Sequence, residues 1–398
     1  MSSFTRLFLF TFFGWAFDFY DLVLLGFIRG AIAEEFHLSH SGEAWVLGVA
    51  LGSSGVGGIV AGALADRIGK RTMLSATILV YSLGSLISGL AHSLPVFLVG
   101  RAVLGLGVGG EWAIGHGLLA ERVRNERRGR ASAALQAGEP TGALLAAFVG
   151  YVVLPHVGWH NVLLGGSVTA LLAVAARRSI HIPDEPAAHG LPRFREIREA
   201  GVASRMARAF VLGTFKLGTY WTCYTWLPGF LQKEMGQGVG KSFLWMATAQ
   251  VGQLLGMLSF GLVSDRFGRR PAFSIYSLVT ACGIAPLVFG WSWLSQHPPL
   301  FWGSMLLLGL GSGCTAGFGA LLAELFPTEI RATMMGATYN LARSVQLFAP
   351  VLVAQAVAWH GLAGGLAVPL CLALLTGTWV WVLPETRGIA LPSLSRKA

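Results

Sequence analysis

The sequence predicts an all-α membrane protein of twelve transmembrane helices arranged as two six-helix bundles. Three observations lead to this prediction: the composition, the spacing of the apolar blocks and an internal duplication. Of the 398 residues, 54% are hydrophobic and only 12% are charged, and the mean hydropathy is +0.62. Soluble domains carry about 25% charged residues. A chain this apolar is expected to lie in a lipid bilayer, which is its first partner.

The apolar residues occur in blocks of the length that a bilayer requires, which is roughly 20 residues of helix. A backbone in lipid must satisfy its own hydrogen bonds, so each block is expected to be a helix. Alternating apolar and polar strands, which a membrane barrel needs, are absent from the sequence. The expected spans are 4–28, 43–64, 72–91, 95–119, 131–153, 160–178, 207–231, 241–262, 271–291, 299–322, 333–357 and 360–383.

The net charge of +10 indicates membrane topology once the charges are placed along the chain. If the N-terminus is cytoplasmic and the helices alternate in direction, most Lys and Arg fall in cytoplasmic segments. The outer loops hold only Arg29, Lys233 and Lys241. This asymmetry follows the positive-inside rule and predicts that both termini are cytoplasmic. No nucleic acid is expected as a partner, and the four cysteines, all inside expected spans, predict neither a disulfide framework nor a metal site.

A polar stretch at 179–206 divides the chain into two halves of six spans each. We expect an N-terminal bundle at 1–178, a cytoplasmic linker at 179–206 and a C-terminal bundle at 207–398. The halves repeat a loop, because "GALADRIGKR" at 62–71 is answered by "GLVSDRFGRR" at 261–270. "GLGVGGEWAIGHGLLAE" is likewise answered by "GLGSGCTAGFGALLAE". Internal duplication of this kind is typical of secondary transporters.

The duplicated loop resembles the signature of the major facilitator superfamily, and "GRAVLGLGVG", which contains Arg101, is similar to its helix-4 motif. "FDFYDLVLLGF", "GGEWAIGHGLLAE", "YTWLPGFL" and "YNLAR" most resemble the proton symporters of organic anions, the sialate, lactate and aromatic-acid carriers. "PETRG" at 384–388 is similar to the closing motif of sugar porters. Two positions depart from the relatives: His160 stands where Arg is common, and Phe19 where Gly is usual.

The resemblance covers the whole chain and implies the major facilitator fold in a bacterial inner membrane. It implies no enzyme activity and no cofactor, and we expect the protein to function as a monomer. In the family, the duplicated loop clips to a neighbouring helix and helps to close the inner gate. Carried onto this sequence, the gating residues are Gly62, Asp66, Arg67, Gly69, Asp265, Arg266 and Gly268.

Two acids in the first span, Asp18 and Asp21, are three residues apart and so lie on one face of a helix. A charged side chain at mid-bilayer costs about 2.5–3.5 kcal/mol, and such groups usually face a cavity or a partner. At about 1.5 Å rise per residue, both acids share a level with Arg101 of the fourth span. We expect one of them, Asp21 in preference to Asp18, to carry a coupling proton. The alternative is a fixed ion pair with Arg101 that only sets helix packing.

Four further charges are expected inside spans. Arg343 lies near mid-membrane in the eleventh span, and its guanidinium could anchor a carboxylate through two hydrogen bonds. Lys216 could assist it or extend to the cytoplasmic boundary. Glu111 and Glu139 fall at one level on antiparallel helices, so contact between them would hold one acid protonated. A structural role for this pair, and Arg343 as a partner of Glu139, remain alternatives.

Polar and aromatic residues of the second half complete the expected substrate site, since aromatic rings with hydroxyl groups suit a small ring or chain. They are Tyr220, Tyr224, Gln250, Gln253, Tyr339, Asn340 and Gln346.

Taken together, the sequence favours a proton-coupled importer of a small organic anion that works by alternating access. Its expected partners are the small-molecule substrate and protons. The alternatives are a carrier of a neutral sugar or polyol, a proton-coupled drug or metabolite exporter and, more distantly, a transporter-like metabolite sensor. An enzyme is not expected, because no nucleotide loop or catalytic set is found at credible depths.

Overall fold

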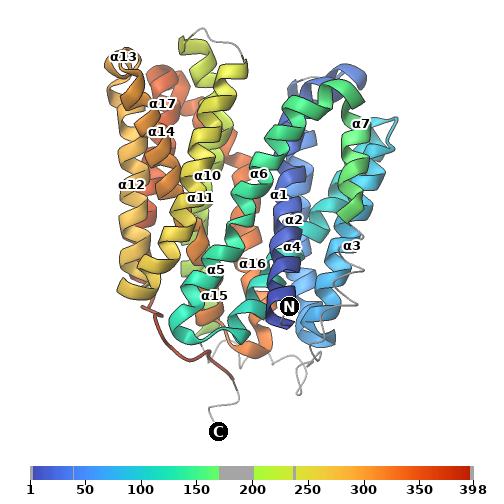
Figure 1. Cartoon of the computed structure of the whole chain (residues 1–398), viewed down its shortest axis with the longest axis vertical. Coiled ribbons are helices and arrows are strands. Elements are labelled where there is room, and N and C mark those ends of the chain that lie inside the picture. Colours follow the sequence, from blue (N-terminus) through green and yellow to red (C-terminus); the bar gives the residue numbers. More distant parts are fainter. Residues whose placement is uncertain (1–2, 39, 170–200, 236–238, 395–398) are drawn as a thin grey trace.

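The computed structural model describes residues 3–38, 40–169, 201–235 and 239–394. Figure 1 shows helices standing side by side in two groups, with α1 beginning and α17 ending at the same end of the molecule. We call this the terminal end. The first group contains α1 (Ser3–Glu35), α2 (His40–Ile68), α3 (Lys70–Gly89), α4 (Leu94–Arg122), α5 (Arg128–Gln136), α6 (Gly138–Phe148) and α7 (Leu154–Gly166).

The second group follows residues that lie outside the described ranges. It contains α10 (Val202–Met235), α11 (Val239–Phe267), α12 (Arg269–Phe289), α13 (Trp291–Leu294), α14 (Pro298–Ser312), α15 (Gly317–Leu325), α16 (Arg331–Ser344) and α17 (Ala349–Trp379). Short helical segments join several of these, among them η1 (Asn125–Arg127), the π-helical η2 (Val149–Val153), η4 (Gly313–Ala316), η5 (Thr328–Ile330) and η6 (Val345–Phe348). The expected linker at 179–206 falls outside the described residues as far as 200, and α10 begins before the expected boundary at 207.

The predicted two-bundle architecture is confirmed. Within the first bundle α4 packs on α2 and α3, and α1 packs on α6; within the second, α14 packs on α11 and α12, and α17 on α10 and α12. The bundles meet where α2 packs on α16 and α5 on α11. Among the described residues, nine helices are long and apolar enough to cross a membrane, or ten if one bent pair counts as a single span.

Breaks in the helices fall where glycine or proline dictates them. Gly158, with φ 77°, interrupts α7 and separates the fifth and sixth expected spans, which otherwise run together from Asn125 to Gly166. Gly361, with φ 68°, does the same inside α17 between the eleventh and twelfth. Positive φ is strained for residues with a Cβ, so glycine sets these turns. The fifth span is divided at Ala137, three residues before Pro140, whose ring cannot continue regular helix hydrogen bonding.

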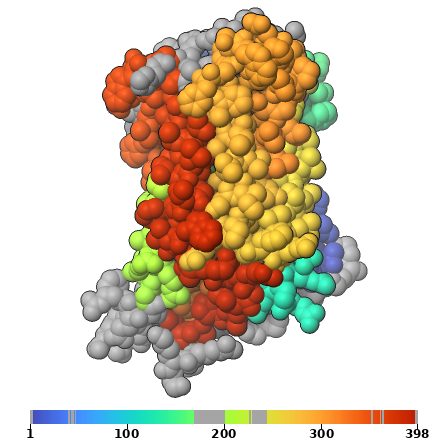
Figure 2. All heavy atoms as spheres, turned by 90° about the vertical axis from the view of Figure 1, so that its left-hand side faces the viewer, coloured from blue at the N-terminus to red at the C-terminus, as the bar shows by residue number. Residues whose placement is uncertain are grey.

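Close contact between the bundles depends on small residues. A Cβ placed on Gly336 of α16 would overlap the backbone of Gly58 in α2, so these helices touch through their main chains. The outward faces are apolar instead. In Figure 2, α17 lies beside α12, and exposed side chains from these helices include Ile275, Leu278, Leu374 and Leu375. Such a face suits contact with lipid acyl chains.

Candidate functional site

A set of charged side chains lies buried halfway along the helices, where the two bundles meet. We call Asp18, Glu111, Glu139, Lys216 and Arg343 the central cluster; each is at most 2% exposed. They come from α1, α4, α6, α10 and α16, so both bundles contribute. Burying this much charge is expensive unless each group is paired or a ligand completes the pairing.

Asp21 stands apart from this cluster, because it is fully paired within the first bundle. Arg101 donates to its carboxylate at 2.6 Å and Ser85 Oγ donates at 2.8 Å, and both charged side chains are fully buried. The predicted contact between the first and fourth spans is therefore present. It takes the form of the fixed ion pair between α1 and α4.

Asp18 faces a second acid instead of Arg101. Its carboxyl group lies within hydrogen-bonding reach of Glu111, and among the described residues neither carboxyl receives a hydrogen bond from a donor. Two carboxyl groups can share a hydrogen bond only when one of them holds a proton. Gly14 makes the approach possible, since a Cβ there would overlap Glu111 Oε1.

Glu139 is hydrogen-bonded to two glutamines and not to Glu111. The sequence predicted only that contact between the two acids would hold one of them protonated. Glu139 accepts a hydrogen bond from Gln136 Nε2 at 2.7 Å and another from Gln253 Nε2 at 2.8 Å. Gln253 belongs to α11, so this carboxylate ties the two bundles together. The two acids, which the helix rise predicts at one depth, face different helices. Glu111 faces α1, and Glu139 faces α11.

Arg343 and Lys216 are buried cations without hydrogen-bond partners in the described part of the chain. The three guanidinium nitrogens of Arg343 make no hydrogen bond within the described residues, and neither does the ammonium group of Lys216. Asp18, Glu139 and Tyr339 lie close enough to Arg343 to interact with it electrostatically. Arg343 makes no hydrogen bond to Glu139, which was the alternative role for this arginine. An oxyanion would satisfy both cations.

Aromatic rings lie beside the central cluster, and one of them, Tyr339, interacts electrostatically with Arg343. Tyr220 and Tyr224 stack with ring centroids 4.5 Å apart, and Phe19 meets Tyr220 edge-on across the bundle interface at 6.4 Å. Trp112 of α4 stacks on Tyr339 of α16 at 3.8 Å. Phe19, a departure from the relatives in the sequence, thus packs between the bundles. These flat surfaces suit a flat ligand.

The remaining amide side chains differ in which of their polar atoms already take part in hydrogen bonds. Asn340 donates to Gly109 O at 2.7 Å across the interface, and Gln346 Nε2 donates to two backbone carbonyls of its own bundle. Oxygen atoms of Gln250, Gln253 and Asn340 have no partner in the described residues. Asn340 therefore joins α16 to α4, whereas the three unpartnered oxygen atoms remain available as hydrogen-bond acceptors.

The residues of the duplicated loop lie at the terminal end and bridge the bundles in two equivalent places. Asp66 accepts hydrogen bonds from Ala332 N at 3.2 Å and from Thr333 N at 2.8 Å, at the start of α16. Asp265 accepts from Gly129 N at 2.9 Å and Arg130 N at 3.0 Å, at the start of α5. Each carboxylate therefore caps the first turn of a helix in the opposite bundle, where the helix dipole favours negative charge.

The backbone geometry explains why glycine stands at three positions of this motif. Gly69 and Gly268 adopt φ 105° and 107°, which turn the chain between consecutive helices. Gly62 lies against the backbone of Ala332 and Thr333, where a Cβ would not fit. Arg67 and Arg266 differ from this picture, because both are exposed and make no described contact with Asp66 or Asp265.

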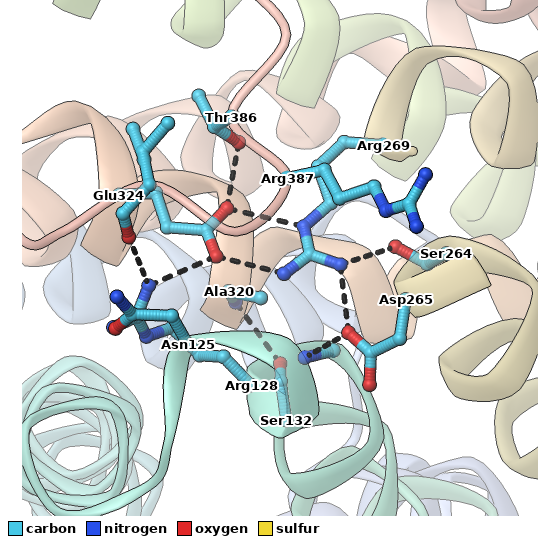
Figure 3. A network of polar contacts seen from close by, with 12 residues as sticks. Asn125, Arg128, Ser132, Ser264, Asp265, Arg269, Ala320, Glu324, Thr386 and Arg387 are labelled. Atoms are coloured by element: carbon cyan, nitrogen blue, oxygen red, sulfur yellow. Dashed lines mark hydrogen bonds and ion pairs between the residues drawn. The ribbon is translucent and has the colours of Figure 1, made fainter. Parts of the chain in front are cut away.

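A dense charge network continues from Asp265, and we call it the terminal network (Figure 3). Arg269 donates to Asp265 at 2.9 Å and to both carboxylate oxygens of Glu324 at 3.1 and 2.7 Å. Glu324 also accepts from Arg128 at 3.1 Å and from Thr386 at 2.6 Å. Every charge in this network has a partner, and the network joins α5 to α12 and α15.

Glu385, from the motif that resembles sugar porters, caps the start of α12. Its carboxylate accepts from Arg269 N at 2.9 Å and Arg270 N at 3.0 Å, and from Thr386 N and Arg387 N at 2.9 Å each. Partial burial raises the pKa of Glu385, but these backbone donors outweigh it and hold the pKa below its ordinary value.

Several residues that complete these sites were missed from the sequence. Gln136 accepts from Trp112 Nε1 at 2.8 Å, contacts His116 Nε2 at 3.0 Å and donates to Glu139. Its signal was its position one turn before Glu139. Arg269 acts where Arg266 was expected, and Gly14 was overlooked because glycine offers no side chain to notice.

Comparison with known proteins agrees with this architecture. The sequence pattern of the Major Facilitator Superfamily matches residues 7–249 and 241–397. The chain is 31% identical over 370 residues to a putative niacin/nicotinamide transporter of Bacillus subtilis, covering 91% of each. It is 31% identical over 396 residues to a probable 4-methylmuconolactone transporter of Cupriavidus pinatubonensis, covering 96% of this chain and 90% of the relative. The fold is similar to that of the proton:xylose symporter XylE, with a TM-score of 0.79, 21% identity and 99% of both chains covered.

Proposed function

The chain belongs to the major facilitator superfamily, and we propose that it imports a small, flat organic carboxylate together with protons. It is a multi-pass membrane transporter and makes or breaks no covalent bond. In the proposed cycle the two bundles rock about the central cluster, which opens alternately to each side of the membrane.

The observation that carries this proposal is the unpartnered guanidinium of Arg343. It is 1% exposed, and none of its nitrogens makes a hydrogen bond within the described residues. A guanidinium matches a carboxylate through two parallel hydrogen bonds, and removal from water strengthens that contact. Lys216 supplies a second positive charge. A bound carboxylate supplies the acceptors that this site lacks.

The flatness of the substrate is inferred from the aromatic walls. The stacked pairs Tyr220–Tyr224 and Trp112–Tyr339 lie beside the central cluster. Tyr339 interacts electrostatically with Arg343, and Tyr220 with Glu139. Two relatives bear names that specify niacin/nicotinamide and 4-methylmuconolactone as cargo. A ring that carries a carboxylate is the simplest ligand that uses both the rings and the guanidinium.

We assign the coupling proton to the pair Asp18–Glu111. With one proton the two acids share a hydrogen bond and carry a single negative charge. Asp18 lies within electrostatic range of Arg343, so an ionised Asp18 competes with a substrate carboxylate for the same cation. Protonation of Asp18 removes that competition and favours substrate binding; loss of the proton favours release. Asp21 is left out, because Arg101 and Ser85 already satisfy it.

The terminal network and the Asp66 and Asp265 caps act in this proposal as the cytoplasmic gate. The central cluster is buried while these caps are formed, which is the arrangement expected when the cytoplasmic side is closed. The distribution of Lys and Arg supports cytoplasmic termini in a bacterial inner membrane. A single chain contains both bundles and the whole proposed site, so it is expected to work as a monomer in the bilayer.

Transport by purified protein in proteoliposomes tests the proposal. We expect labelled nicotinate to accumulate when the outside is acidic, and the medium to become more alkaline on its addition. Asp18→Asn and Glu111→Gln are each expected to lose accumulation driven by the pH gradient while retaining counterflow. Glu34→Gln, an exposed acid of α1, is the matched control and should behave as wild type.

Three outcomes of this experiment contradict the proposal. Uptake of xylose but of no carboxylate contradicts the assigned substrate class. Carboxylate transport that is indifferent to the pH gradient contradicts proton coupling. Normal accumulation by both Asp18→Asn and Glu111→Gln contradicts the assignment of the proton.

A further inference from the structure

A cluster of potential metal ligands lies far from the central cluster, at the end of the first bundle opposite the terminal network. Glu35 is the last residue of α1, His92 lies in the turn between α3 and α4, and His160 belongs to α7. One donor atom from each of these side chains lies within 4.8 Å of the others. The proposed transport cycle uses none of these three residues.

The backbone and one aromatic ring hold two of these ligands in place. Gly158 turns the chain at φ 77° so that the next residue, Trp159, is 5% exposed while His160 lies at the surface. Trp159 stacks on the His160 ring with centroids 3.6 Å apart and donates from Nε1 to Glu35 at 2.9 Å. The second carboxylate oxygen of Glu35 faces His160 Nε2 at 3.5 Å.

The third ligand completes a donor set of two imidazoles and one carboxylate. The rings of His92 and His160 lie 5.5 Å apart, and His160 Nε2 also contacts Ala91 O at 3.2 Å. Nε2 is the nitrogen of His160 that faces Glu35 Oε1, so Nε2 is the atom that would bind the metal. The ring proton is then carried by Nδ1, and the lone pair of Nε2 is available to the metal.

We propose that Glu35, His92 and His160 bind one divalent transition-metal ion of the zinc class. Zinc ligands lie about 2.0–2.2 Å from the ion, and a site with three protein ligands keeps a fourth position for water. The donor atoms must therefore move closer together than 4.8 Å. They can do so because His160 and Glu35 side chains are 28% and 37% exposed and His92 is exposed.

Bound metal would join the end of α1 to the α3–α4 turn and to α7. The ion would thus stiffen the first bundle at the end of the helix that carries Asp18 and Asp21. This inference does not depend on the proposed substrate or on proton coupling, because its ligands and its test are separate from the central cluster.

The competing interpretation is that His160 and Glu35 form only an ion pair. The variant His160→Arg distinguishes this interpretation from metal binding. Arginine keeps a positive charge beside Glu35 but cannot bind the metal. Zn²⁺ is titrated into purified, untagged protein by calorimetry, and thermal unfolding is followed with and without Zn²⁺. We expect wild type to bind one Zn²⁺ per chain, and His92→Ala, His160→Ala and His160→Arg each to weaken binding at least tenfold.

His156→Ala is the matched control, since His156 is exposed at the same end of the same bundle and outside the ligand set. Its Zn²⁺ affinity should equal that of wild type, and Mg²⁺ should bind to none of these proteins because it prefers oxygen ligands. His160→Arg should unfold at the wild-type temperature without metal but lose the stabilisation that Zn²⁺ gives wild type. The proposal is overturned if wild type binds no Zn²⁺, or if His92→Ala and His160→Arg bind it as tightly as His156→Ala.

Discussion

The central cluster and the terminal network both bury charged side chains between the bundles, but they differ in how those charges are paired. In the terminal network Glu324 and Arg269 each reach several partners at hydrogen-bonding distance. In the central cluster Arg343 and Lys216 make no hydrogen bond among the described residues, and Asp18 and Glu111 face only each other's carboxyl group.

This difference separates two uses of buried charge. A paired network holds segments in one arrangement, because each buried charge is stabilised by an opposite charge within the protein. Unpaired buried groups are costly in the same environment and are retained where something else completes them. The comparison therefore assigns the terminal network to holding the bundles together and the central cluster to binding a ligand and a proton. Changing one group in each region tests this assignment.

The largest expected effect is loss of stability when a charge is removed from the paired network. Arg269→Met keeps most of the side-chain volume but leaves Glu324 and Asp265 without their shared donor. Removal of one partner of a buried ion pair costs about 3–5 kcal/mol. We expect a marked fall in the melting temperature of the purified protein. Arg266→Met, from the same loop but exposed, is the control and should melt like wild type.

Replacement of the unpaired guanidinium by an ammonium group should weaken substrate binding and leave stability unchanged. Arg343→Lys is expected to bind the carboxylate substrate about 100-fold more weakly, a loss of roughly 2.7 kcal/mol, because an ammonium cannot reproduce the paired hydrogen bonds. Its melting temperature without substrate should stay at or above that of wild type, since no hydrogen bond of Arg343 is lost. Calorimetric binding and thermal melts measure the two quantities. A destabilised variant with normal affinity would reverse the assignment of the two regions.

The proton site can be tested without removing either acid. In Gly14→Ala the new methyl group would occupy the position of Glu111 Oε1, and the flexible end of the glutamate must turn away from Asp18. We expect a loss of about tenfold in pH-driven accumulation in proteoliposomes, with counterflow retained. Gly26→Ala lies on the same helix with no atom within 4 Å of the new Cβ and is the control. Equal accumulation by the two variants would argue against a shared proton.

Much of the architecture could be predicted because it depends on one-dimensional quantities. Span length and the duplicated loop gave the two bundles, and the rise of a helix placed Asp21 level with Arg101. Depth alone does not say which way a side chain points around its helix. Glu111 and Glu139 are predicted at one depth. Glu111 nevertheless faces α1, where Gly14 leaves room for it, and Glu139 faces α11, where Gln253 donates a hydrogen bond to it. Those directions depend on packing between segments far apart in the sequence.

The same limit explains the arginines of the duplicated loop. Arg67 and Arg266 belong to the recognised motif, but the helices beyond Gly69 and Gly268 turn the next basic residues, Lys70 and Arg269, toward acidic partners. Lys70 contacts Glu121, which Arg331 also contacts at 2.7 Å. This arrangement in the first half mirrors Arg269, Glu324 and Arg128 in the second. Glu121 is 21% exposed where Glu324 is fully buried, so the second half of the network is the better shielded from solvent.

The smallest expected effect concerns Glu385, which is attached to the terminal network but exposed. A carboxylate at a helix start contributes about 0.3–1 kcal/mol, and Glu385→Gln should lower the melting temperature of purified protein slightly at neutral pH. The pKa of Glu385 is lowered in the folded protein, so its contribution is present above the ordinary glutamate value of about 4.3. It is lost as the pH falls below that value through the folded pKa. Melts of the two proteins should therefore converge in strongly acidic buffer, whereas Glu34→Gln should match wild type at every pH. A difference between wild type and Glu385→Gln that grows as the pH falls would show that the cap does not act through its charge. Glu385 would then not be counted among the residues that stabilise the terminal network through their charge.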